Sequence, residues 1–163
     1  MVKRTYKYRF YPTDQQARTL AQTFGCVRFI YNFGLATRST AYKEQGKKLS
    51  YHDLSALLPA LKEQFPWLKD VSSVPVQQSL RHLDTAFQNF FEGHAKYPTF
   101  KKKQNAQLAT YAASAFSWDA SILTLAKMKE PLTIVWSRPL PKGCKPSTVT
   151  VSKDCAGRYF VSL

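Results

Sequence analysis

A single strand pattern stands at the N-terminus, far from all other strand patterns, and this order most constrains the fold. Residues 2–11 alternate, with Val2, Tyr6, Tyr8 and Phe10 on one side and Lys3, Thr5, Lys7 and Arg9 on the other. A period of two is typical of a half-buried strand, here with a cationic outer face. Because an isolated strand is not stable, we expect this strand to pair with the last strands of the chain.

The residues that follow carry helix signals. Thr13-Asp14-Gln15-Gln16 is a capping-box start. We predict a first helix over about 14–24 that stops near Gly25, and a second over about 26–45. A third helix begins after Ser50 and is kinked or ended by Pro59. Ser72 or Ser73 caps a fourth helix, whose core-facing stripe comprises Val76, Leu80, Leu83, Phe87, Phe90 and Phe91.

Short apolar runs at 122–127, 132–136, 147–151 and 158–163 predict a small antiparallel β unit. The fold class that we expect is α+β, a small OB-like wedge barrel with an inserted helical bundle. Residues 1–12 would be its first strand, 13–95 the bundle, 96–115 a basic linker and 116–163 the rest of the barrel. Because Leu163 falls inside an apolar strand, we expect a truncated chain whose end strand is an uncovered edge.

The charge of the chain indicates a polyanionic partner. Lys and Arg number 24 against 10 Asp and Glu, which gives a net charge of +14. Residues 1–50 carry +8, residues 51–95 carry −2, and residues 96–110 and 111–163 carry +4 each. Nucleic acid is the usual partner of such a surface, and a membrane surface is the next. No apolar run approaches the roughly 20 residues of a membrane span, and three cysteines without a CxxC motif fit a reducing cytoplasm.

Two classes of nucleic-acid contact are predicted. Cations on a strand face or in a loop suit phosphates, and aromatic or amide side chains suit bases. The residues that we expect to bind nucleic acid are Lys3, Lys7, Arg9, Arg28, Tyr51, Gln77, Gln78, Arg81, Lys101, Lys102 and Lys103. The structural alternatives are a solvated strand face, a tyrosine packed in the bundle and a solvated surface amide.

Catalytic motifs are missing from the sequence. The ten Asp and Glu residues fall in predicted caps, turns and helix surfaces rather than inside apolar strands, where two-metal nucleases need them. His52, His82 and His94 have no zinc-ligand spacing with the three cysteines. We therefore expect a chain without catalytic activity of its own and without a metal or other cofactor.

The order of several motifs resembles the N-terminal half of the TnpB (OrfB) proteins of insertion sequences, which are transposon-encoded RNA-guided DNA endonucleases. The segments that carry the resemblance are Phe10-Tyr11-Pro12, residues 25–32 (GCVRFIYN), Leu49-Ser50-Tyr51, Gln78-Ser79-Leu80, residues 86–91 (AFQNFF), residues 97–103 (YPTFKKK) and residues 138–141 (RPLP). No one of them is decisive alone, but their order is specific and covers nearly the whole chain.

The resemblance implies a wedge-type β-barrel split by a helical recognition bundle whose first helices are described as a helix-turn-helix. In that family this half helps to hold the guide RNA and reads a short motif beside the DNA target. Tyr51 and the Gln77-Gln78 stretch match the motif-reading segments, whereas Ser72-Ser73 replaces a frequent cation. The RuvC-like nuclease core, with its divalent metal, and the zinc ribbon would follow Leu163, so the missing RuvC-like domain is an expected partner.

Three alternatives remain open. A stand-alone helix-turn-helix repressor would prefer duplex DNA and dimerise on palindromic half-sites. A native chain that continues past Leu163 would be an active nuclease. A basic structural RNA-binding protein is the third alternative.

Overall fold

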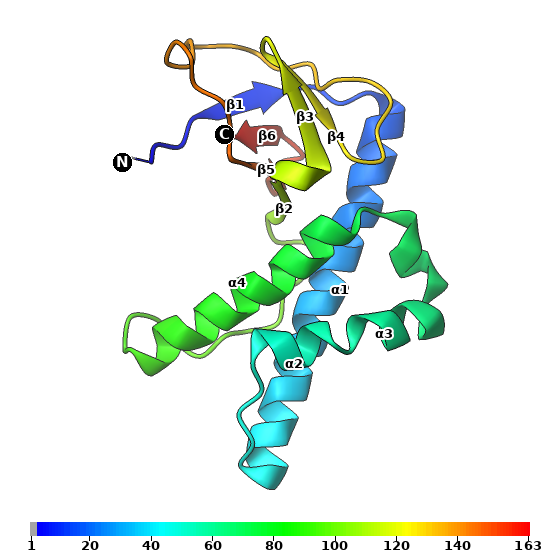
Figure 1. Cartoon of the computed structure of the whole chain (residues 1–163), viewed down its shortest axis with the longest axis vertical. Helices are drawn as coiled ribbons and strands as arrows, with labels where there is room; N and C mark the ends of the chain where they lie inside the picture. The colour runs from blue at the N-terminus through cyan, green and yellow to red at the C-terminus, as the bar shows by residue number, and fades with distance from the viewer. Residues whose placement is uncertain (1–2) are drawn as a thin grey trace.

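A computed structural model describes residues 3–163, so the predicted strand position of Val2 lies outside the described residues. The elements run β1 (Lys7–Phe10), α1 (Asp14–Gln45), α2 (Tyr51–Ser55), α3 (Leu58–Gln64), a 3₁₀ turn η1 (Pro66–Asp70) and α4 (Ser73–Phe91). They continue with β2 (Gln107–Ala112), η2 (Ala113–Ala115), β3 (Phe116–Asp119), β4 (Ile122–Leu125), β5 (Thr148–Lys153) and β6 (Tyr159–Ser162). The α+β class and the insertion of helices between β1 and the other strands are as expected (Figure 1).

The main sheet is antiparallel, with strand order β1-β6-β5-β2. The first strand pairs with the last, with Lys7 opposite Ser162 and Phe10 opposite Tyr159, which confirms the expected pairing. The expectation of an uncovered end strand is wrong, because β6 lies between β1 and β5 and both of its edges are bonded.

The described strands do not close into a barrel. Strands β3 and β4 form a separate two-stranded sheet, and β1 and β2 remain the outer strands of the main one. The predicted strand over 132–136 supplies only an isolated bridge from Ile134 to Phe10, with backbone hydrogen bonds to the outer edge of β1. Residues 107–112, which we assigned to a linker, instead form β2 and pair with β5 along their whole length.

Helix α1 is one continuous helix of 32 residues, so the prediction of two helices divided at Gly25 is wrong. The helix persists because the buried residues on either side of Gly25 belong to two different cores. Leu20 and Phe24 pack with the sheet, whereas Cys26 and Ile30 pack with the other helices. Helix α1 therefore joins the sheet rigidly to the helical bundle (Figure 1).

The helix ends follow the predicted capping. The Thr13 side chain accepts from the Gln16 backbone while the Gln16 side chain accepts from the Thr13 backbone, and Ser50 and Asp53 repeat this capping box at α2. Ser72 caps α4. Pro59 lies in the first turn of α3, so it separates α2 from α3 as expected.

The predicted stripe of α4 is largely core, because Val76, Leu80, Leu83 and Phe87 are buried against α1. Phe91 is an exception, with 60% of its surface exposed. No helix within residues 3–163 is both long and apolar enough to cross a membrane.

Candidate nucleic-acid interface

The outer face of the main sheet carries the cations predicted from β1. Tyr8 and Phe10 point into the core, so Lys7 and Arg9 point to the opposite side. Phe160 is the strand partner of Arg9 and shares that outer side. Lys7 Nζ lies 4.5 Å from the centre of the Phe160 ring, and the Arg9 guanidinium lies 5.7 Å from it. One aromatic ring thus brings two cations together.

Two further contacts extend this cationic group. The Arg158 guanidinium lies 6.0 Å from the Phe160 ring and pairs with the Asp154 carboxylate at 2.6 Å. The Arg9 guanidinium also lies 5.0 Å from the Tyr11 ring, and its Nε is buried without a hydrogen-bond partner among the described residues. The cations of β1 are therefore held over aromatic rings while the rest of their donors remain available. Lys3 precedes β1 and is exposed.

The three loop lysines are positioned by side chains of α1 and β2. Asn32 clasps the backbone of Lys101, since its Nδ2 donates to the Lys101 carbonyl at 3.0 Å and its Oδ1 accepts from the Lys101 N–H at 2.7 Å. Gln107 donates to the Lys103 carbonyl at 3.1 Å and accepts from Arg28 at 3.0 Å. This sequence segment is therefore an anchored loop that presents its ammonium groups beside α1.

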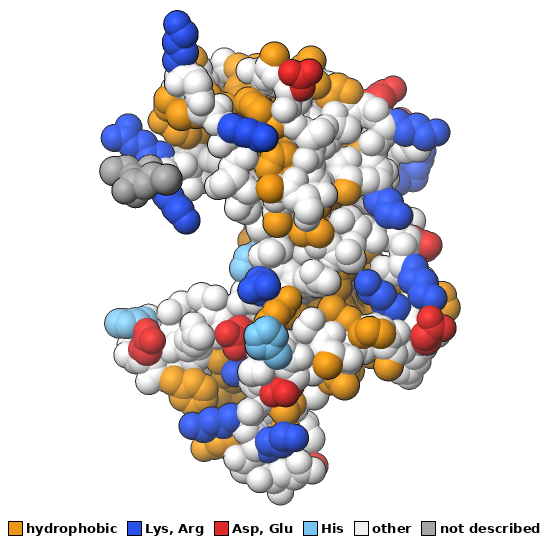
Figure 2. All heavy atoms as spheres, viewed as in Figure 1, with side chains coloured by type: hydrophobic (Ala, Val, Ile, Leu, Met, Phe, Trp, Pro, Cys, Tyr) orange, Lys and Arg blue, Asp and Glu red, His pale blue; other side chains and the backbone are white. Residues whose placement is uncertain are grey.

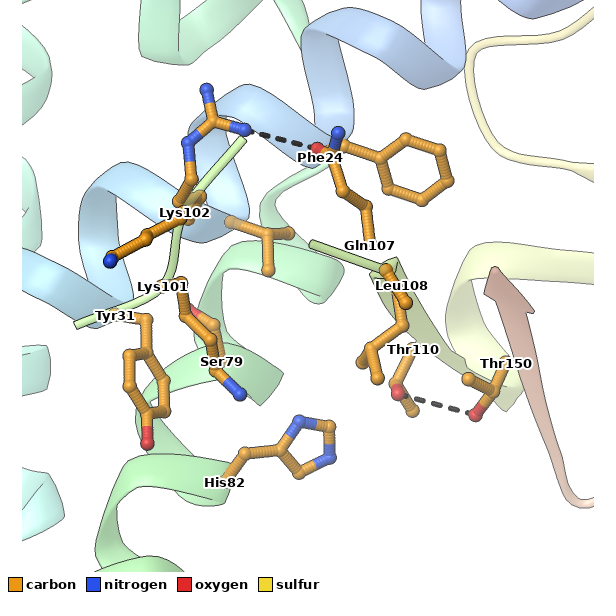
Figure 3. A pocket seen from close by; sticks show the side chains of 13 residues that line it. Phe24, Tyr31, Ser79, His82, Lys101, Lys102, Gln107, Leu108, Thr110 and Thr150 are labelled. Carbon is orange, nitrogen blue, oxygen red and sulfur yellow. Dashed lines mark hydrogen bonds between the residues drawn. The ribbon is translucent and has the colours of Figure 1, made fainter. Parts of the chain in front are cut away.

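A pocket of about 450 Å³ opens where α1, α4, this loop and the sheet meet (Figure 3). Its apolar wall includes Phe24, Val27 and Leu108, and Thr110 and Thr150 extend it onto the outer face of the sheet. Lys101 and His82 point toward one another on one side, and the Thr110–Thr150 pair lies on the other. In the space-filling view the surface is hollowed between the strands and α4, with Lys and Arg side chains on the strand side (Figure 2).

The electrostatics of this pocket are cationic. Arg28, Lys101 and Lys102 line it, and no Asp or Glu is found among the described residues that do so. Lys101 Nζ lies 4.8 Å from the centre of the Tyr31 ring. The pKa of His82 is lowered, first because the imidazole is partly withdrawn from water and second because Lys101 is near. At neutral pH the pocket therefore offers ammonium and guanidinium groups together with an uncharged imidazole.

The predicted base-reading residues form a separate group on α2 and α4. The Arg81 guanidinium lies 4.3 Å from the centre of the Tyr51 ring, which holds the two side chains together. Gln77 is exposed one helical turn before Arg81, and Gln78 beside it is half-buried. None of these four residues lines the pocket. The structure thus places the predicted residues in three groups, the β1 face, the pocket and the Tyr51–Arg81 surface, except for Lys103, which is exposed in the loop and does not line the pocket.

Sequence reasoning did not select Phe160, Asn32 or the Thr110–Thr150 pair. The alternation of residues 158–163 places Phe160 and Val161 on different faces of the strand. This alternation was the available signal for an outward aromatic residue. Thr110 and Thr150 become neighbours only through the pairing of β2 with β5, where their hydroxyl oxygens lie 3.3 Å apart. No local pattern indicates that contact.

Several acidic side chains serve structural roles. Asp53 caps α2, and bonds from the backbone and hydroxyl of Ser50 lower the pKa of its carboxyl group. Asp84 pairs with Arg38 at 3.0 Å, and Glu63 pairs with Lys69 at the same distance. Over residues 3–163, no three His, Cys, Asp or Glu side chains are grouped so that they could hold a metal ion.

A family model and two relatives found by comparison with known proteins point to the same family. Residues 1–47, which span β1 and α1, match a family model described as a helix-turn-helix domain of OrfB proteins. The chain is 55% identical over 165 residues to a "Putative RNA-guided DNA endonuclease" of Streptomyces pristinaespiralis, a match that covers 99% of the chain and 41% of that protein. It is 30% identical over 166 residues to the "Putative RNA-guided DNA endonuclease InsQ" of Escherichia coli (strain K12), covering 97% of the chain and 39% of that protein.

A third relative is shorter. The "Virulence protein VsdF" of Salmonella dublin is 35% identical over 116 residues, which cover 64% of the chain and 98% of that protein. The chain spans about two fifths of the length of the two endonuclease relatives, with shares of 41% and 39%.

Proposed function

The chain belongs to the TnpB (OrfB) family of insertion-sequence proteins, and from this premise we propose that it is a nucleic-acid-binding part of such a protein. Its ligands would be a guide RNA and the DNA beside the target. The observation that carries the proposal is the meeting of cations from β1, α1 and the loop before β2 along one sheet face and one pocket.

These cations lack counter-charges within the described chain. Of the 24 Lys and Arg residues, only Arg38, Lys69 and Arg158 form salt bridges within residues 3–163. Cations gathered without carboxylates repel one another, and a phosphate backbone relieves that repulsion. The arrangement therefore favours a polyanionic ligand and a strong dependence of affinity on salt.

The sheet offers a path between the two cationic groups. Thr110, Thr150 and Ser162 form a row on the outer side of the sheet that ends at Lys7 on β1, with Thr110 buried beside the pocket and Thr150 and Ser162 half-buried. Three strand spacings make this row about 14 Å long. A nucleic-acid strand lying across it would meet hydroxyl groups between cations at both ends, and Phe160 would offer an aromatic surface beside it.

We assign base reading to the Tyr51–Arg81 surface. The stack on Tyr51 limits the freedom of the Arg81 guanidinium, and Gln77 lies one turn away on the same helix. Guanidinium and amide groups are the side chains that bond base edges in pairs. A preferred sequence beside the target would be read here, while the lysine groups would contact phosphates.

Cleavage is proposed to reside outside this chain. Asp53, Asp84 and Asp154 are occupied by a cap or by ion pairs rather than directed toward a common point. With Mg²⁺ present, the chain should bind nucleic acid and leave plasmid DNA intact. Metal-dependent cutting that is lost on changing one of its acidic residues would refute this assignment.

The phosphate contacts are tested by a triple variant, Lys101→Gln, Lys102→Gln and Lys103→Gln. Affinity for structured RNA, single-stranded DNA and duplex DNA is measured by fluorescence anisotropy at several salt concentrations. The slope of log affinity against log salt should fall by about 2 to 3, at roughly 0.7–0.9 per lost contact. The matched control changes the exposed Lys129, Lys142 and Lys145, which do not line the pocket. Equal losses in both triple variants would refute the proposed interface.

Base reading is tested separately with Gln77→Ala, and the exposed Gln64 at the end of α3 provides the control Gln64→Ala. On a preferred duplex, selected from a randomised pool, Gln77→Ala should cost about 1–3 kcal/mol of binding free energy, with the salt slope unchanged. A uniform loss over all sequences would end the base-reading assignment. A preference for palindromic duplexes without any RNA would instead favour a repressor.

A further inference from the structure

Contacts with the phosphate backbone of a nucleic acid do not explain the shape and chemistry of the pocket between α1, α4 and the sheet. Phosphates need only surface cations, yet this site has about 450 Å³ of space behind its lysines. The wall of that space is apolar, with Phe24, Val27 and Leu108 facing it. A ligand that fills it must combine a flat or apolar body with an anionic group.

A nucleotide has this combination. The faces of a base are apolar and its edge is polar, whereas the phosphate takes ammonium and guanidinium donors. In the pocket, Lys101 and Lys102 stand on one side and the Thr110–Thr150 pair on the other, with the apolar wall between (Figure 3). No described lining residue is a carboxylate that would repel a phosphate.

The polar groups of the pocket are also available for a ligand. Lys101 Nζ is held over the Tyr31 ring at 4.8 Å and forms no hydrogen bond with any residue in 3–163. The Ser79 hydroxyl is buried and donates to the Val76 carbonyl, so the ammonium groups of Lys101 and Lys102 are the donors left for a ligand. Asn32 and Gln107 fix the loop backbone, so the site is preformed rather than assembled by the ligand.

We propose that this pocket receives one unpaired nucleotide of a bound strand, with its base against Val27 and Leu108 and its phosphate on Lys101 and Lys102. The inference rests on the proposed function, because it needs a strand bound to the adjoining sheet face. The pocket selects an extruded or single-stranded nucleotide, since a base that is still stacked in a duplex cannot enter a recess between α1, α4 and the sheet.

The first test uses mononucleotides as probes. Adenosine 5′-monophosphate, uridine 5′-monophosphate and inorganic phosphate are titrated into the chain, and the methyl resonances of Val27 and Leu108 are followed by NMR. Both monophosphates should shift these resonances, and inorganic phosphate should not. Equal shifts with inorganic phosphate, or none with either nucleotide, would overturn the proposal.

Two variants fill the pocket without touching the core. Leu108 is 44% exposed on the edge strand β2, and Ala106 is exposed in the loop, so Leu108→Trp and Ala106→Trp place an indole in the space. Each should weaken binding of a 2-aminopurine-labelled single strand by about tenfold, the effect of losing one stacked base. The control Ile122→Trp, at a position that is 54% exposed outside the pocket, should bind as the wild type does. Unchanged binding by both pocket variants would overturn the proposal.

The outcomes separate this inference from the proposed function. If the triple lysine variant loses oligonucleotide binding while both indole variants keep it, the pocket assignment alone fails. If neither the two indole variants nor the triple lysine variant changes oligonucleotide binding, the proposed interface itself is wrong. A competition experiment distinguishes a nucleotide in a strand from a free one: the oligonucleotide should displace the monophosphate, and simultaneous binding of both would overturn the strand assignment.

Discussion

Two glycines of α1 should respond in opposite ways to the same substitution. A methyl group at Gly34 would lie 2.8 Å from Leu83 Cδ2 and 3.1 Å from Leu80 Cδ2, in the core between α1 and α4. At Gly25 the nearest heavy atom would be Arg28 Nη2 at 4.0 Å. Neither glycine has a positive φ, so both positions tolerate an L-residue in backbone terms. The two sites therefore differ only in the space available.

The expected sizes follow from helix propensity and packing. Alanine is favoured over glycine inside a helix by about 1 kcal/mol, so Gly25→Ala should stabilise the chain by roughly that amount. At Gly34 the same gain is opposed by overpacking of about 1–3 kcal/mol, because the ends of the buried Leu80 and Leu83 side chains must shift to make room. The net effect of Gly34→Ala is a loss of about 0–2 kcal/mol.

Thermal unfolding followed by circular dichroism at 222 nm measures the difference. A gap of about 1–3 kcal/mol corresponds to about 2–12 °C in Tm for a chain of this length, with Gly25→Ala the more stable variant. Guanidinium unfolding should give the same order with similar m values. If Gly34→Ala proves as stable as Gly25→Ala, the close approach of α1 to α4 is wrong.

Two further predictions concern the interface. Asn32→Ala removes both hydrogen bonds that hold the Lys101 backbone and should weaken nucleic-acid binding by up to about tenfold. The control Asn105→Ala, in the same loop, should leave affinity unchanged. Equal losses of affinity in anisotropy assays would contradict the positioning role of Asn32. His82 should titrate below its ordinary pKa of 6.5 when its ring protons are followed by NMR, and Lys101→Gln should move the midpoint only part of the way back, because withdrawal from water is the larger cause. Because the pKa of His82 is lower in the folded state than in the unfolded state, the stability contributed by neutral His82 is complete above pH 6.5 and is lost as the pH falls through the folded-state pKa. A titration midpoint of His82 at or above 6.5 would contradict the pocket environment.

The sequence determined the local secondary-structure elements and the positive sign of the surface charge. Alternation in residues 2–11 predicted a strand with Lys7 and Arg9 outward, and the capping boxes at Thr13 and Ser50 fixed two helix starts. The order of elements also predicted that the first strand pairs with the last. These features depend on neighbouring residues or on the period of the apolar pattern, which can be read from the chain directly.

Tertiary structure decided the rest. Gly25 does not end α1, because residues on both sides of it are buried in two cores, and burial outweighs the weak preference of glycine for a helix end. Residues 107–112 become β2 because β5 offers a partner, although their own pattern is not periodic. The end strand is central rather than exposed, since β1 bonds one of its edges and β5 bonds the other.

The candidate site shows the same division. The cations of β1 and of the loop before β2 could be selected from the sequence, because charge and strand alternation are local properties, whereas Arg158 was not selected. Their grouping could not, because Lys7 meets Phe160, Asn32 clasps Lys101 and Thr110 meets Thr150 only across large separations in the chain. Such contacts are set by strand register and helix packing, which depend on the whole core, and the pocket that they enclose exists only in the folded chain.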